Sequence, residues 1–268
     1  MRKIDTIIFD WAGTLVDFGC MAPVKVFIEV FREVGIEITE AEAREPMGLS
    51  KRQHIIAIIK QPRVQQLWIE HFGEPATKRD IDILYKAFEP KLLASVSDYV
   101  ELIPGVVETL NKLRKQGIKI GSTSGYSRQV LDKIISLAQA QGLELDYSVA
   151  GDECKEGRPS PFMIFRNMEH FSTYHTDSVI KVGDTVSDIE EGLNAGVWTV
   201  AVITGNEIGM SNGDWTALST EKKEEIMHHA KDNFNRYGAH FILKDLNRLI
   251  EVIEEINLIL ICETNNQY

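Results

Sequence analysis

The sequence predicts an α/β fold built on a doubly wound parallel sheet, with a helical segment inserted into it. Short apolar runs of strand length recur along the chain, and several of them end beside a small or polar residue. Patterns with helical spacing lie between these runs, and such alternation is typical of a parallel sheet. Residues 21–99 break the alternation, because their pattern is helical throughout.

The six expected strands are short apolar runs, as in sheets that helices cover on both faces. They span residues 6–9, 118–122, 147–150, 179–183, 198–203 and 240–243. Three runs end close to a polar side chain, which is Asp10, Ser124 or Asp184. Because ligands of such folds bind beyond the carboxyl ends of the strands, we expect these side chains at one edge of the sheet.

The expected helices have apolar residues at helical spacing. In the core they span residues 106–116, 127–140, 161–171, 187–195, 219–237 and 246–258, and in the insertion 24–34, 40–46, 53–59 and 78–95. We therefore expect a core domain formed by residues 1–20 and 100–268, and a helical cap domain formed by residues 21–99. The last ten residues, 259–268, which include the polar residues 264–267, are expected to fray, and no role is predicted for the tail after Leu258.

Composition and charge exclude several classes of protein. The chain has 268 residues, of which 44% are hydrophobic and 26% are charged, and this balance is typical of a globular protein. A net charge of −11 disfavours nucleic acid and anionic membranes as partners. Three widely spaced cysteines, Cys20, Cys154 and Cys262, predict neither a disulfide framework nor a zinc site. Without a signal-peptide pattern or a long apolar run, the expected location is the cytoplasm.

Four groups of polar residues predict phosphate chemistry. Asp10, at a strand end beside a glycine-containing loop, is suited to act as a nucleophile that accepts a phosphoryl group. Together with Asp184 and Asp188 it forms an oxygen-rich set that suits Mg²⁺. Ser124 and Arg158 each precede a predicted helix and are suited to bind phosphate. Taken singly, each group has a purely structural alternative, namely a turn residue, a helix cap or a surface arginine.

The order of these groups is more specific than any one of them. It resembles the four-motif pattern of the haloacid-dehalogenase-like (HAD) superfamily over residues 1–20 and 100–245, which implies a Rossmann-like HAD core. Phosphatases of that superfamily carry a second aspartate, the general acid, at the position of Ala12 here. One alternative function is a general HAD-type phosphomonoesterase, but such an enzyme would need an acid at the position of Ala12. A second alternative is a non-catalytic phosphate-binding protein, but such a protein would be expected to lack the catalytic carboxylates, and Asp10, Asp184 and Asp188 are all present.

Longer segments resemble one family, the phosphonoacetaldehyde hydrolases (phosphonatases), over almost the full chain. The segments are DWAGT at 10–14, EAREPMGLSK at 42–51, GSTSGY at 121–126, KVGDTVSD at 181–188 and NAGVWTV at 194–200. Leu15 and Ser124 depart from the family, where threonine is usual, although Ser124 keeps the hydroxyl. The resemblance implies hydrolysis of the carbon–phosphorus bond of phosphonoacetaldehyde to acetaldehyde and phosphate.

The segment at 42–51 draws attention to Lys51, which by resemblance forms a Schiff base with the aldehyde. Lys51 and His54 are spaced to share one face of a helix. An amine that is partly desolvated beside another ionisable group has a lowered pKa, as Schiff-base chemistry requires. Judged without the resemblance, Lys51 is more simply a solvated lysine beside Arg52.

The resemblance also assigns the remaining roles. Asp10 forms an aspartyl-phosphate, and Mg²⁺ is held by Asp10, Asp184 and the Ala12 carbonyl, with Asp188 in an outer position. Ser124 and Arg158 bind the phosphate. His54, Tyr126 and Met47 assist proton transfer around the imine.

A homodimer is also implied by the resemblance. The dimer contact is expected to use cap helices whose apolar face includes Phe27, Val30 and Phe31. The alternative is that these three side chains pack inside the cap.

Overall fold

Six parallel strands form one sheet in the order β3-β2-β1-β4-β5-β6, in a computed structural model that describes residues 2–265. The strands are β1 (Thr6–Phe9), β2 (Lys119–Ser124), β3 (Tyr147–Ala150), β4 (Val179–Gly183), β5 (Trp198–Val202) and β6 (Phe241–Leu243). The predicted doubly wound parallel sheet is thereby confirmed. The chain builds outward from β1 in one direction and then returns to add β4 on its other side. In such sheets, ligands bind at the carboxyl ends beside this reversal.

Helices cover both faces of the sheet, because alternate strand residues point to opposite sides. Ile7 and Phe9 of β1 belong to the main core, which α6 (Val106–Lys115), α7 (Arg128–Gln139) and α12 (Leu249–Asn265) cover. Ile8 points the other way, into a smaller cluster with α8 (Phe162–Phe171) and α9 (Val186–Ala195). On that side α11 (Thr220–Arg236) packs against β5. The short helix α10 (Asn212–Ala217) precedes α11.

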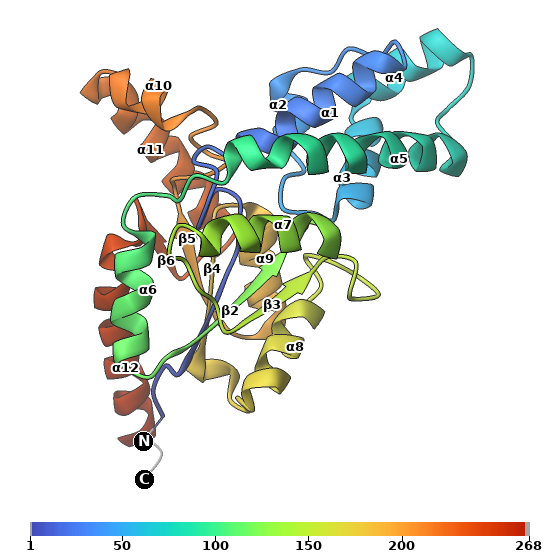
Figure 1. Ribbon diagram of the computed structural model, residues 1–268. Helices are drawn as coiled ribbons and strands as arrows, with labels where there is room; N and C mark the ends of the chain where they lie inside the picture. Colours follow the sequence, from blue (N-terminus) through green and yellow to red (C-terminus); the bar gives the residue numbers. More distant parts are fainter. Residues whose placement is uncertain (1, 266–268) are drawn as a thin grey trace.

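Five helices fall within residues 21–99 and lie together beyond the sheet (Figure 1). They are α1 (Met21–Glu33), α2 (Glu40–Arg44), α3 (Lys51–Lys60), α4 (Pro62–Phe72) and α5 (Lys78–Ser95). Their interior is aromatic, and the rings of Phe27 and Phe88 stack with centroids 4.3 Å apart. Phe27, Val30 and Phe31 are all buried within this group. The apolar face that was considered for a dimer contact is therefore used inside the helical segment.

Contacts across the junction hold this helical segment against the sheet. The hydroxyl of Ser187, in the first turn of α9, donates to the Met47 carbonyl at 3.2 Å. A Cβ on Gly48 would fall 2.3 Å from Thr185 Oγ1, so only glycine permits this approach. The turn between α2 and α3 therefore lies directly against the carboxyl end of β4.

The predicted boundaries differ from the structure at a few places. Strand β2 continues to Ser124, which is its last residue rather than the start of a loop. Helix α3 begins at Lys51, earlier than its apolar periodicity indicates, because its first turn is polar. The chain between α3 and α5 forms a separate helix, α4, which has proline in its first turn.

The carboxyl-terminal helix also differs from its prediction. Helix α12 continues to Asn265, well past Leu258, so residues 259–265 are helical rather than frayed; residues 266–268 lie outside the described residues. Within residues 2–265, no helix is long and apolar enough to cross a membrane.

Candidate active site

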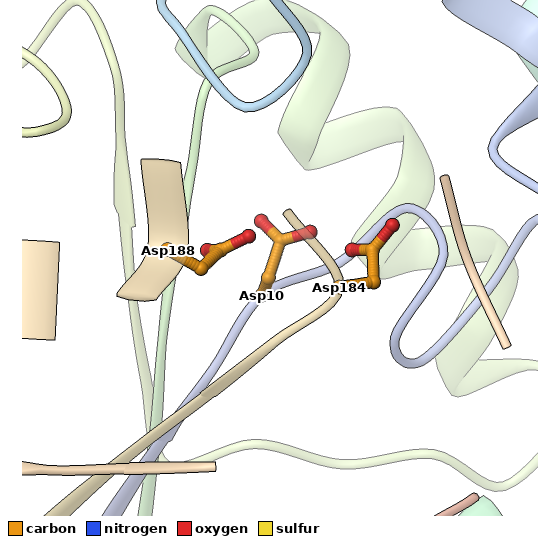
Figure 2. Close-up of side chains that lie close together, drawn as sticks. All are labelled: Asp10, Asp184 and Asp188. Atoms are coloured by element: carbon orange, nitrogen blue, oxygen red, sulfur yellow. The ribbon is translucent and has the colours of Figure 1, made fainter. Parts of the chain in front are cut away.

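Three buried carboxylates meet at the carboxyl end of the sheet. Asp10 directly follows β1, Asp184 directly follows β4, and Asp188 lies in the first turn of α9. One oxygen of each lies within 4.8 Å of the others. Figure 2 shows Asp10 between the other two. The parallel register explains this meeting, since Phe9 pairs with Val182 and both strands then end at the same edge.

Asp188 is held by cations of the protein itself. Its Oδ1 lies 2.9 Å from both Arg158 Nη1 and Lys181 Nζ, and its Oδ2 accepts a hydrogen bond of 2.6 Å from the Thr185 hydroxyl. Burial disfavours its charge, but the two cations and this hydrogen bond lower the pKa of Asp188. It therefore stays ionised, with its oxygens already committed to protein groups.

Asp184 has a different environment. Its Oδ1 accepts from the Thr14 hydroxyl at 3.1 Å, and its Oδ2 accepts from the Asn206 backbone N–H at 2.7 Å. No cation of residues 2–265 pairs with it. Burial raises the pKa of Asp184 well above its usual range, and the charges of Asp10 and Asp188 raise it further. A carboxylate in this position needs a cation from outside the chain to stay ionised.

These features fit a divalent metal ion. Asp10 and Asp184 supply hard oxygen donors that magnesium and calcium prefer, and the negative charge of Asp184 is not balanced by the described part of the chain. Ala12, in the loop after β1, lines the adjoining cavity. Asp188 fits an outer position better than a direct one, because Arg158 and Lys181 already occupy it.

Arg158 fixes one oxygen of Asp10. Its Nη2 lies 2.6 Å from Asp10 Oδ1 and donates to the carbonyl and hydroxyl of Thr123, each at 2.8 Å, while its Nε donates to Glu191 at 3.0 Å. Its side chain is only 1% exposed. Within residues 2–265, Oδ2 of Asp10 has no hydrogen-bond or ion-pair partner. Asp10 lines the cavity, and this unpaired oxygen is the one available to attack a substrate.

Lys51 is a buried amine without a counter-ion. It is the first residue of α3 and is 6% exposed, and it forms no ion pair with any described residue. Its Nζ lies over aromatic faces, 4.8 Å from the ring centre of Tyr126 and 5.9 Å from that of Phe27. Burial lowers the pKa of Lys51, and the nearby Arg158 adds to this effect against the opposing influence of Cys20 and Asp10. A larger fraction of this amine is therefore neutral and nucleophilic.

His54 lies one turn further along α3, behind Lys51 rather than on the cavity wall. Its Nε2 contacts the Ala43 carbonyl at 2.8 Å, so Nε2 carries the proton, and its ring packs on Phe27 with centroids 4.0 Å apart. Burial and the charge of Lys51 lower the pKa of His54 well below its usual range. Its buried Nδ1, with no partner among the described residues, is thus a free acceptor.

One small cavity joins the predicted residues of the core and of the helical segment. Its lining is Asp10, Ala12, Cys20, Met47, Gly48, Lys51, Ser124, Gly125, Tyr126, Arg158 and Thr185. Seven residues predicted from the sequence are thus brought together, whereas Asp184 and Asp188 lie beside Asp10 and His54 lies behind Lys51. The cavity volume of about 20 Å³ holds about one water molecule, so in this conformation it is too small for a phosphonate substrate.

Sequence reasoning missed a buried layer beneath this cavity. Lys181 is fully buried within β4, and its Nζ contacts Asp188 at 2.9 Å, Glu191 at 3.0 Å and the Thr123 hydroxyl at 2.6 Å. Two signals were available. A lysine inside an apolar strand needs a buried partner, and Glu191 follows Asp188 by three residues, which places both on one face of α9.

Comparisons with known proteins agree with this geometry. The sequence model of the haloacid dehalogenase-like hydrolase family matches residues 7–202 of this chain. The chain is 44% identical to the phosphonoacetaldehyde hydrolase of Parabacteroides distasonis, over 96% of this chain and 98% of that protein. It is also 44% identical to the phosphonoacetaldehyde hydrolase of Bacillus cereus, over 95% of this chain and 97% of that protein. The chain belongs to the phosphonoacetaldehyde hydrolase family.

A solved structure supports this family at the level of the fold. The phosphonoacetaldehyde hydrolase-like protein of Oleispira antarctica superposes with a TM-score of 0.92 and 38% identity, over 95% of this chain and 92% of that protein. The similarity therefore includes the helical segment and its docking on the sheet as well as the sheet itself.

Proposed function

We propose that this chain hydrolyses the carbon–phosphorus bond of phosphonoacetaldehyde to acetaldehyde and phosphate, through a Schiff base on Lys51 and an aspartyl-phosphate on Asp10. One observation carries the proposal. A buried lysine that has no counter-ion within residues 2–265 lines the same cavity as a carboxylate with one oxygen that is unpaired in that range. Relatives at 44% identity that are named phosphonoacetaldehyde hydrolases support the choice of substrate.

Lys51 solves the problem that a carbon–phosphorus bond presents. Direct cleavage would expel a carbanion, which is a very poor leaving group. The neutral amine adds to the aldehyde carbon, one proton is taken up from solvent, and water leaves, which gives a cationic iminium adjacent to the breaking bond. When Oδ2 of Asp10 attacks phosphorus, the electron pair of the carbon–phosphorus bond moves into the iminium and forms an enamine. Water then hydrolyses both covalent links and restores the lysine and the carboxylate.

The surrounding side chains support these steps. The free Nδ1 of neutral His54 is suited to accept protons from the Lys51 amine when the segment moves, and Tyr126 keeps its phenolic proton because burial raises its pKa. Met47 lines the cavity and would pack against the aldehyde end of the substrate. Ser124 and Arg158, which line the same cavity, would bind the phosphoryl oxygens.

We propose Mg²⁺ as the cation at the carboxylate cluster. Asp10, Asp184 and the Ala12 carbonyl would hold it, and Asp188 would act from outside. When bound, it would neutralise charge on the phosphoryl oxygens. We also propose that residues 21–99 form a cap domain that opens to admit substrate, that residues 1–20 and 100–268 form the core domain, and that the protein acts as a homodimer.

Incubation of the protein with phosphonoacetaldehyde and Mg²⁺ tests this function. Acetaldehyde and phosphate should appear in equal amounts, and EDTA should stop their release. Borohydride added with substrate should inactivate the protein, and peptide mapping should find the label on Lys51. Rapid hydrolysis of simple phosphate monoesters, without cleavage of phosphonoacetaldehyde, would instead favour a phosphomonoesterase.

A further inference from the structure

Arg44 ties three separate segments together, although it does not itself line the cavity and pairs with none of Asp10, Asp184 and Asp188. It is the last residue of α2, and its side chain is 12% exposed. Nη1 donates to the Gly19 carbonyl at 2.9 Å, and Nη2 donates to the Gly209 carbonyl at 3.0 Å. Glu40, one turn earlier, accepts from Nε at 3.0 Å and from Nη2 at 2.8 Å. The guanidinium is thus oriented from α2 and joins the linker before α1 to the loop after β5.

The loop after β5 is the same one that supports Asp184. The backbone N–H of Asn206 donates to Asp184 Oδ2 at 2.7 Å. Gly205 presses on the same carboxylate so closely that a Cβ there would fall 1.9 Å from Oδ2. Arg44 Nη1 also reaches Asn206 Oδ1 at 3.5 Å. A displacement of this loop therefore moves the only backbone donor to Asp184 within residues 2–265.

The linker joins the same unit. Gly19 donates its N–H to the Thr204 carbonyl at 3.0 Å, and a Cβ on Gly19 would fall 2.0 Å from the Met210 carbonyl oxygen. The linker and the loop after β5 are therefore packed against each other, with the Arg44 guanidinium bridging both. Because Arg44 belongs to the helical segment, a change in the position of that segment would also move the loop.

We propose that Arg44 is a positioning residue that couples docking of the helical segment to the orientation of Asp184. It holds the loop of residues 204–210 in the place where the Asn206 N–H aims the carboxylate toward the proposed metal site. The inference rests on the magnesium site of the proposed function. Groups that orient a metal ligand without touching the ion commonly change metal affinity by about 10–100-fold.

Mg²⁺ binding in the absence of substrate tests the coupling, by isothermal calorimetry on the full-length protein. Arg44→Gln should weaken Mg²⁺ binding about tenfold, because the loop loses its bridge to α2. The matched control is Arg63→Gln. Arg63 also bonds to α2, through Glu42, and to the Glu37 carbonyl, but it does not reach the loop after β5. The control should bind Mg²⁺ as the native protein does, even if its thermal stability falls.

Arg44→Lys keeps the positive charge and a long side chain, so it tests the coupling if the Arg44→Gln variant does not fold. One ammonium cannot span both carbonyls in the way that the guanidinium does, so its Mg²⁺ affinity should fall between native and Arg44→Gln. Native affinity in Arg44→Lys, together with native affinity in any folded Arg44→Gln protein, would overturn the coupling and leave the metal site intact. Absence of Mg²⁺ binding to the native protein would overturn both proposals.

Discussion

Two buried lysines lie in opposite environments on the two sides of the cavity. Lys181, in the sheet, contacts two carboxylates and a hydroxyl, all within 3.0 Å. Lys51, in the helical segment, faces two aromatic rings and pairs with no carboxylate among residues 2–265. Both amines are almost fully excluded from solvent. The difference is therefore in their partners and not in their burial.

This contrast separates a structural charge from a reactive one. A buried ammonium that is matched by carboxylates is stabilised as a cation and cannot act as a nucleophile. A buried ammonium without a partner loses its hydration with no compensation, so its neutral form becomes more favourable. The lysine suited to form an imine is thus the one that the chain leaves unpaired. Five predictions test this contrast, and they are ordered by the size of the expected effect.

Replacement of Lys51 by arginine should have the largest effect. Arginine keeps the positive charge but does not form an imine, because guanidinium stays protonated. Turnover of phosphonoacetaldehyde should fall by about 10⁴-fold, as expected for loss of a covalent catalytic group. Coupled assays of acetaldehyde and phosphate measure this. Lys60→Arg, at the exposed end of the same helix, is the control and should be close to native. Near-native turnover in Lys51→Arg would refute the imine role.

Asp10→Asn should separate phosphoryl transfer, which uses Asp10, from imine formation, which uses Lys51. Phosphate release should fall by about 10³-fold or more, because the nucleophilic oxygen is replaced by an amide. Imine formation uses Lys51 and precedes phosphoryl transfer, so borohydride should still label Lys51 in the presence of substrate. Mass spectrometry of the tryptic peptides reads out the label. If the variant released no phosphate and also escaped labelling, the two steps could not be independent, and the order proposed here would be wrong.

Removal of each lysine should have opposite consequences for stability. Lys181→Met leaves Asp188 and Glu191 buried with Arg158 as their one shared cation within residues 2–265, and should lower the free energy of unfolding by about 3 kcal/mol. Lys51→Met removes an unpaired buried charge and places an apolar side chain among aromatic rings, so it should not lower that free energy. Urea denaturation at neutral pH compares the two variants with the native protein. Equal losses in both would show that Lys51 also has a stabilising partner.

Much of this site could be predicted because it depends on local patterns. The strand ends at Asp10 and Asp184 follow short apolar runs, and a parallel sheet brings such ends to one edge whatever lies between them. Lys51 was found through a family resemblance and not through its own neighbours. Its burial depends on Tyr126, which is distant in the sequence and lies just after strand β2.

The remaining contacts could not be predicted because they join residues across the junction. Arg44 donates to the carbonyl of Gly209, which lies 165 positions away in the sequence. The local sequence around neither residue predicts this contact. The separate helix α4 was not predicted as an element, since its amphipathic pattern runs on from that of α3 with only Gln61 between them. Long-range docking, rather than local propensity, decides these features.

The smallest effect concerns pH and tests the unpaired state of Lys51 directly. Only the neutral amine attacks the aldehyde, and burial lowers the pKa of Lys51 below the usual 10.5. The rate of imine formation, sampled with substrate at each pH and trapped by borohydride, should rise with pH and level off above this lowered pKa. Its half-maximal rate should thus lie below pH 10.5, whereas a paired lysine would place it above.

The same shift predicts the stability difference between Lys51→Met and the native protein. Because the pKa is lower in the folded state, burial of the charged amine costs most at pH values below that pKa. The cost disappears as pH rises toward the unfolded value of 10.5. The advantage of Lys51→Met should therefore be greatest at neutral pH and shrink in alkaline solution, as measured by urea denaturation across this range. An advantage that grows with pH would mean that Lys51 is held as a cation in the folded protein, as Lys181 is.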